Sequence, residues 1–122
     1  MERAIRIVAG DVVARGVLND GRTATAIWEA LPLEMKAQTW GDEVYGDIGI
    51  TAAAEQPRAT VAMGDLGYWP PGRALCIFFG PTPASRGDEI RPASPVDVVG
   101  RVEDAPAFRR VRDGARVRIE RA

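Results

Sequence analysis

The apolar run ALCIFF, residues 74–79, is the feature that most constrains the fold of this chain. Pro70, Pro71 and Gly72 precede the run, and a loop rich in Gly, Pro and Ser follows it over residues 80–95. Two adjacent prolines cannot donate ladder hydrogen bonds, so they separate the run from the strand-like segment DLGYW before it. An apolar run between such turn signals is typical of a central strand that is covered on both faces.

The other segments of the chain predict further short strands joined by turns. Apolar residues alternate through residues 3–18 with a pause at Gly10 and Asp11, which predicts a β-hairpin. Residues 42–50 alternate apolar positions with polar or small ones, the period of a half-buried antiparallel strand. Strands are also expected in residues 34–40, 65–69, 96–102 and 115–121.

One short helix is expected over residues 23–31, between the stop signal Asn19-Asp20-Gly21 and Pro32. Ala24, Ile27, Trp28 and Leu31 share one face of this helix. We interpret Trp28 as a core residue that packs the helix against the sheet, because apolar residues at helical spacing are usually structural. Residues 104–111 are expected to form a short turn or helical piece.

Seven to nine short strands with one or two short helices predict a mainly β fold. The expected architecture is a closed antiparallel β-barrel of about eight strands with one or two capping helices, because closure removes exposed strand edges. A chain of 122 residues is large enough to bury a core without disulfides or metals. We therefore expect one domain over residues 1–122.

Charge and residue usage exclude several partners and chemistries. The formal net charge of -1 leaves no basic field for nucleic acid or anionic lipid, and the apolar runs are too short to span a bilayer. We expect no nucleic-acid or membrane partner and a cytoplasmic location. The absence of histidine removes Ser-His-Asp catalysis and the usual zinc sites. No metal and no cofactor are expected.

The cysteine and the carboxylates favour structural roles. Cys76, the only cysteine, lies inside the apolar run and is expected to be a buried, inert thiol. Asp42 and Glu43 are adjacent, so on a strand they face opposite sides and cannot act as a pair. Asp47 and Asp65 are flanked by glycine, where turn hydrogen bonds commonly explain an aspartate. No catalytic residue is assigned.

The aromatic residues around the Pro-Pro-Gly turn have two interpretations. Tyr68 and Trp69 either close one end of the core at a rigid corner, or form an aromatic-lined groove together with Trp40 and Tyr45. Rigid amphipathic rings give such a groove a large contact area for an apolar or proline-containing ligand. Arg73, or Arg91 in the long loop, would supply a cation to this groove if it is not a solvated surface residue.

Three segments carry a resemblance to a known family: WGDEVYGDIGI, VAMGDLGYWPPGRALCIFFGPTPAS and RPASPVDVVGRV. They resemble the small prokaryotic cyclophilin-like family over most of residues 3–121, most specifically over residues 63–85. The resemblance implies an eight-stranded barrel with helical caps and a largely undefined function. LCIFFG is similar to the cyclophilin strand whose phenylalanine lines the proline pocket, which implies this role for Phe78 or Phe79. The Phe-His-Arg stretch that carries the cyclophilin arginine does not occur here.

Three functions follow as hypotheses. The first is a binding module for a peptide segment or small apolar ligand, the second a weak peptidyl-prolyl isomerase with a displaced arginine, and the third a small-molecule metabolic enzyme or ligand-binding subunit. The expected ligand-binding residues are Trp40, Tyr45, Tyr68, Trp69, Arg73 and Phe78.

Overall fold

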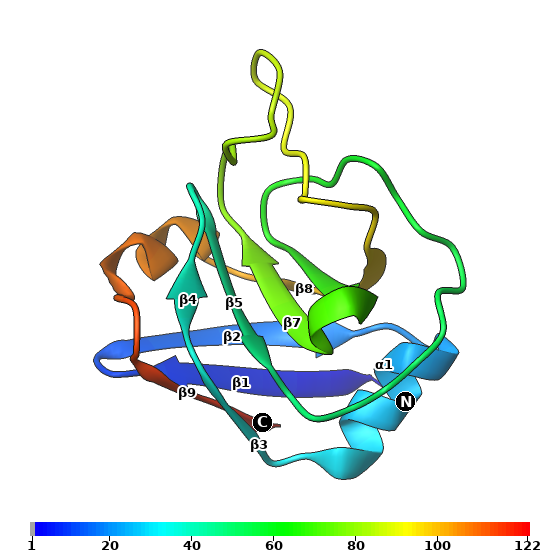
Figure 1. The fold of residues 1–122 in the computed structure, drawn as a ribbon. Coiled ribbons are helices and arrows are strands. Elements are labelled where there is room, and N and C mark those ends of the chain that lie inside the picture. The colour runs from blue at the N-terminus through cyan, green and yellow to red at the C-terminus, as the bar shows by residue number, and fades with distance from the viewer. Residues whose placement is uncertain (1) are drawn as a thin grey trace.

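The computed structural model describes residues 2–122, which form nine strands of one antiparallel sheet, a short α-helix and two 3-10 helices (Figure 1). The strands are β1 (Arg3–Ala9), β2 (Val12–Leu18), β3 (Leu33–Lys36), β4 (Gln38–Thr39), β5 (Glu43–Asp47), β6 (Asp65–Trp69), β7 (Ala74–Phe78), β8 (Asp97–Val102) and β9 (Arg116–Arg121). The helices are α1 (Arg22–Ala30), η1 (Pro70–Gly72) and η2 (Ala105–Arg110). The strand order is β3-β9-β1-β2-β8-β6-β7-β5-β4, and the mainly β barrel expected from the sequence is confirmed.

The two ends of the sheet are joined at Ala37, between β3 and β4. β3 pairs with β9 at one end of the strand order, and β4 pairs with β5 at the other. The Ala37 N–H donates to the carbonyl of Ala115 at 2.8 Å, and its carbonyl accepts from the Gly114 N–H at 2.8 Å. The single strand expected over residues 34–40 is therefore two strands, because the chain leaves β9 at this point and crosses to β5.

Close contact between the β2 and β8 backbones depends on glycine. A Cβ atom on Gly100 would lie 2.3 Å from the carbonyl oxygen of Val17, and one on Gly16 would lie 2.5 Å from that of Arg101. Both positions are within the β2–β8 ladder, where Gly16 pairs with Val102 and Leu18 with Gly100. Side chains here would push the two strands apart at the point where the sheet curves.

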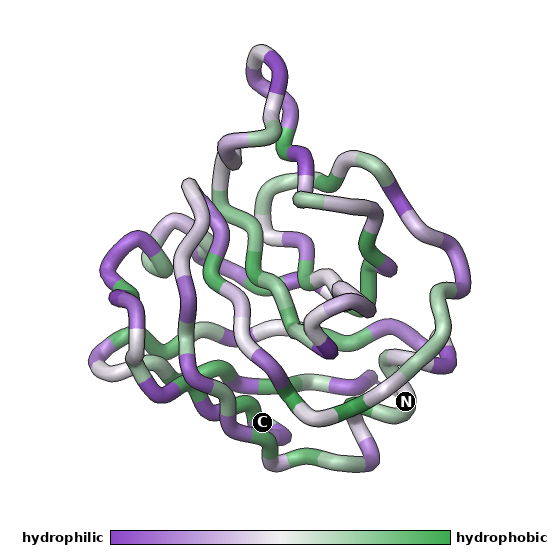
Figure 2. Tube along the Cα trace, viewed as in Figure 1, coloured by the Kyte–Doolittle hydropathy of each residue, from purple (hydrophilic) through white to green (hydrophobic). Residues whose placement is uncertain are grey.

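β7 separates two apolar clusters, as expected for a strand covered on both faces. Leu75 and Ile77 point into the larger cluster inside the barrel, whereas Cys76 and Phe78 belong to a smaller cluster on the opposite face. All five residues of β7 are buried. The residues of β7 itself are hydrophobic (Figure 2). The loop that projects from the barrel between β7 and β8 is hydrophilic near its tip.

The helix α1 covers one end of the barrel with Ala24 and Ile27, which are buried. Trp28, expected in the core, is only partly buried and packs against its edge. The guanidinium of Arg121, the last residue of β9, lies 4.2 Å from the centre of the Trp28 ring, so this face of the ring is covered by a cation rather than by apolar side chains. No helix within residues 2–122 has the length and apolar character needed to cross a membrane.

Candidate functional site

A small pocket with aromatic walls lies on the outer face of β5, β6 and β7. Seven residues line it: Trp40, Glu43, Tyr45, Trp69, Pro92, Ala93 and Val96. Its volume is about 220 Å³, below the roughly 300 to 1,000 Å³ of pockets that hold drug-sized ligands. We call it the aromatic pocket, and its size suits one side-chain-sized group.

Strand pairing brings the two central rings of the aromatic pocket together. Tyr45 on β5 pairs with Cys76, and Trp69 on β6 pairs with Ala74, so β7 holds both flanking strands in register. The centres of the two rings are 6.3 Å apart and their planes are inclined by 79°, an edge-to-face arrangement. The rings thus form two nearly perpendicular walls.

Hydrogen bonds fix the orientation of both rings. The Trp69 indole N–H donates to Ser94 Oγ at 2.6 Å, and the Tyr45 hydroxyl donates to Gln38 Oε1 at 3.0 Å. Ser94 belongs to the long loop before β8, so the same bond places the Pro92–Ala93 wall against the indole. The pocket is therefore organised before any ligand arrives.

The long loop is held in place by its own side chains and by short bridges. The Ser85 hydroxyl accepts from the backbone N–H groups of Thr82 and Arg91 at 2.9 and 3.0 Å, and Thr82 Oγ1 donates to the Arg91 carbonyl. Val96 also exchanges two backbone hydrogen bonds with Arg58. These contacts turn a segment without regular structure into a fixed wall of the pocket.

Glu43 is the charged member of the lining, and sequence reasoning missed it. Its side chain is on the same face of β5 as Tyr45, and the residue is only 5% exposed. Burial raises the pKa of Glu43 from 4.5 to about 7, and a hydrogen bond from the Cys76 thiol opposes this rise. Glu43 takes part in none of the ion pairs among residues 2–122.

The structure brings together Trp40, Tyr45 and Trp69 of the expected site, and it places the other three residues elsewhere. Tyr68 does not face the pocket: it is fully buried in the larger cluster, where its hydroxyl donates to the Ile50 carbonyl and accepts from the Ala52 N–H. Neighbouring strand residues point to opposite faces, so Tyr68 and Trp69 cannot line one groove. Phe78 is fully buried in the smaller cluster and supports the pocket from beneath.

Neither candidate arginine lines the aromatic pocket. Arg73 is half-exposed after η1 and forms an ion pair with Asp47 at 2.7 Å. Arg91 forms an ion pair with Glu89 at 2.6 Å. Each guanidinium is engaged by a carboxylate outside the pocket lining, so the positive charge expected in the groove is not there.

Asp47 and Asp65 have the turn roles expected from the sequence. Asp47 Oδ1 accepts from the Gly49 N–H at 2.7 Å, and Asp65 Oδ2 accepts from the Ala62 N–H at 2.8 Å. Within residues 2–122, no group of three or more Asp, Glu or Cys side chains is arranged to hold a metal ion.

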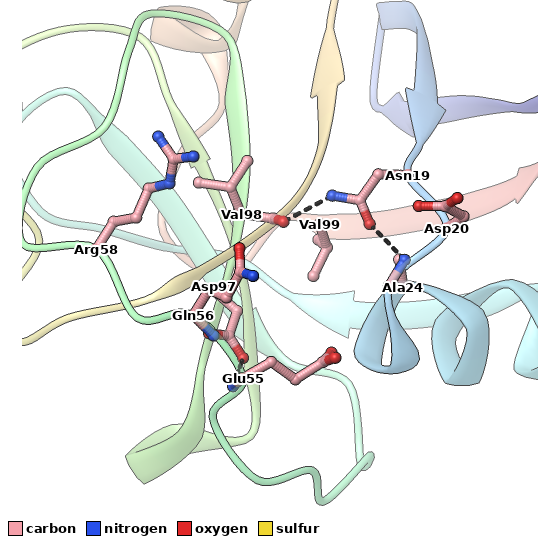
Figure 3. A pocket seen from close by; sticks show the side chains of 10 residues that line it. Asn19, Asp20, Ala24, Glu55, Gln56, Arg58, Asp97, Val98 and Val99 are labelled. Carbon is pink, nitrogen blue, oxygen red and sulfur yellow. Dashed lines mark hydrogen bonds between the residues drawn. The ribbon is translucent and has the colours of Figure 1, made fainter.

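A second, larger pocket lies beside the start of α1, and its polar groups serve the fold (Figure 3). Asn19 donates to the Val98 carbonyl and accepts from the Gly21 N–H. Asp97, which is buried, accepts from the backbone N–H groups of Glu55 and Gln56. Glu55 in turn accepts from the N–H of Thr23 in the first turn of α1. These contacts tie the segment before β6 to the helix and to β8.

Comparisons with known proteins agree with this fold. The family model described as cyclophilin-like matches residues 3–120. The solution structure of a hypothetical protein from Archaeoglobus fulgidus superposes with a TM-score of 0.84 and 38% sequence identity, covering 99% of this chain and 95% of that one. None of the curated proteins compared with the chain matches it. Because the family model spans nearly the whole length, the chain belongs to the cyclophilin-like family.

Proposed function

We propose that this protein is a binding module whose aromatic pocket takes a small apolar group, presented by a small molecule or by a peptide segment. The observation that supports it is the convergence of Trp40, Tyr45 and Trp69 on one pocket, in which hydrogen bonds fix the Tyr45 and Trp69 rings. Rings that are already ordered lose little conformational entropy when a ligand binds.

The lining favours binding over chemistry. Among its seven residues only Glu43 can exchange a proton near neutral pH, and none is an arginine. Prolyl isomerisation is aided by a cation that hydrogen-bonds the prolyl nitrogen, and Arg73 and Arg91 are engaged by Asp47 and Glu89 instead. The isomerase alternative therefore has no supporting contact in this pocket.

An NMR titration tests the binding function with reporters already in the chain. Of the three tryptophans, Trp40 and Trp69 line the pocket, whereas Trp28 lies on α1 and packs against the larger apolar cluster. We expect 3,3-dimethylbutan-1-ol or a short proline-containing peptide, at millimolar concentration, to shift the indole N–H signals of Trp40 and Trp69 but not that of Trp28. Unchanged pocket signals with both probes would contradict the proposal.

A substitution of Trp40 tests whether the shift at Trp69 comes from a ligand in the aromatic pocket. Trp40 belongs to neither apolar cluster, so Trp40→Ala should cost less than about 1 kcal/mol of folding stability. We expect this variant to lose most of the shift at Trp69. Exchange between the cis and trans signals of the same peptide, with and without protein, tests the isomerase alternative in the same samples.

A further inference from the structure

We propose that the preferred occupant of the aromatic pocket is an organic ammonium group, with the Glu43 carboxylate as its counter-ion and the rings of Trp40, Tyr45 and Trp69 as its walls. The inference rests on the proposed binding function and names the chemical class of the ligand. The shared chemistry is a methylated ammonium, carried by a small molecule or by a modified lysine side chain.

Glu43 has no structural task that explains its burial. The other buried acidic residues of the described chain hold backbone groups: Asp97 accepts from two N–H groups, and Asp65 accepts from the Ala62 N–H. Within residues 2–122, the one side-chain hydrogen bond that lowers the pKa of Glu43 comes from the Cys76 thiol, which is a weak donor. A buried carboxylate with so little compensation is unfavourable unless a cation or further donors arrive.

No cation among residues 2–122 is positioned to supply that compensation. The titratable groups beside Glu43 are the Cys76 thiol, from β7, which lowers its pKa, and the Tyr45 hydroxyl, from the same strand, whose own pKa is raised by the Glu43 charge. Burial raises the pKa of both, so both stay neutral near pH 7. Trp40, which follows β4, lines one side of the pocket, and the long loop lines another with Pro92, Ala93 and Val96. None of these side chains is charged. The missing positive charge is therefore expected on the ligand.

The rings add a second attraction for the same charge. The face of an aromatic ring is negative, and a cation near it is stabilised, most strongly by tryptophan. Tyr45 and Trp69 form perpendicular walls, and Trp40 adds a third ring to the lining. Several rings beside one carboxylate suit a methylated ammonium, because its methyl groups pack against apolar walls while its charge faces Glu43.

A matched pair of probes tests this inference separately from the binding function. Choline and 3,3-dimethylbutan-1-ol have nearly the same shape, but choline carries a positive nitrogen where the alcohol has carbon. We expect choline to bind about tenfold more tightly at pH 8, as measured by the indole shifts of Trp40 and Trp69. Choline affinity should fall between pH 8 and pH 6 as Glu43 takes up a proton, whereas the affinity of the alcohol should stay constant.

Two glutamine variants locate the charge that is responsible. Glu43→Gln should reduce the preference for choline over the alcohol to the part that the rings supply, and should abolish its dependence on pH. Glu29→Gln, which removes an exposed carboxylate on α1, should behave as the unmodified protein. A peptide with one trimethyllysine, compared with the same peptide carrying unmodified lysine and with free choline, distinguishes the two sources of the group.

The outcomes separate the two proposals. If the alcohol binds as tightly as choline, or if Glu43→Gln keeps the full preference and its pH dependence, the ammonium inference is wrong and the binding function stands. If neither probe shifts the pocket indoles, both are wrong. The pH dependence in the unmodified protein needs no variant, so the inference stays testable even if Glu43→Gln does not fold.

Discussion

At the scale of single residues, Glu43 links the pocket to the stability of the fold. Its pKa is raised from 4.5 to about 7, so between these values the folded protein holds a proton that the unfolded chain releases. Folding stability from this group is therefore fully present below pH 4.5 and is lost as the pH rises through about 7. The loss amounts to about 3 kcal/mol if the whole shift is realised.

We expect Glu43→Gln to be more stable than the unmodified protein at pH 8, by up to about 3 kcal/mol, and nearly equal to it at pH 4. Chemical denaturation at the two pH values measures this difference. Glu29→Gln serves as the control, because it changes the net charge equally from an exposed position. An advantage of Glu43→Gln that is the same at both pH values would mean that the carboxylate titrates normally in the folded state.

The thiol of Cys76 should be inert in the folded protein. The residue is 1% exposed, and burial and the neighbouring Glu43 raise its pKa well above the ordinary value. The reactive species is the thiolate, which is therefore both scarce and shielded. We expect a thiol reagent to label Cys76 only when denaturant is added. Absorbance or mass spectrometry measures the labelling. Rapid labelling of the native protein would mean that β7 is exposed.

At the scale of the elements, the two-residue period of a strand accounts for both the successes and the errors at the site. It correctly predicted β5, whereas β7 was predicted from its continuous apolar run, and it separates Glu43 and Tyr45 from Val44. The same period excludes Tyr68 from the face that carries Trp69. Glu43 could have been found from its spacing to Tyr45, but its burial depends on the loop at residues 92–96, which no local pattern positions.

The glycines at the β2–β8 contact give a prediction about element packing. Gly100→Ala would place a Cβ 2.3 Å from the Val17 carbonyl oxygen, and backbone cannot move aside as a flexible side chain does. We expect a loss of about 1 to 3 kcal/mol, measured by thermal or chemical denaturation. Val13→Ala on the exposed face of β2 is the comparison and should change stability much less, since Val13 is 59% exposed. A loss at Gly100 no larger than at Val13 would show that the strands separate easily.

At the scale of the whole molecule, a closed barrel could be predicted from the number of short strands, but the place where the two ends of the sheet meet could not. The ends meet where β3 is followed directly by β4, on either side of Ala37. That junction is set by pairing to β9 on one side and β5 on the other, segments distant in sequence. The aromatic pocket depends on the same long-range order, since its lining comes from three separate parts of the chain.

This arrangement predicts an uneven distribution of stability, which hydrogen exchange measures. β7 lies between β5 and β6 with every side chain buried, so the amides of Leu75, Cys76 and Ile77 should exchange only when the whole protein unfolds. The segment at residues 53–60 is exposed and is attached by few bonds, including those of Arg58 to Val96 and of two amides to Asp97. Its amides should exchange through local opening, with protection that depends little on denaturant. Equal protection and equal denaturant dependence for Arg58 and Ile77 would instead mean that the segment unfolds together with the barrel. This wall of the second pocket, beside the start of α1, would then belong to the cooperative core.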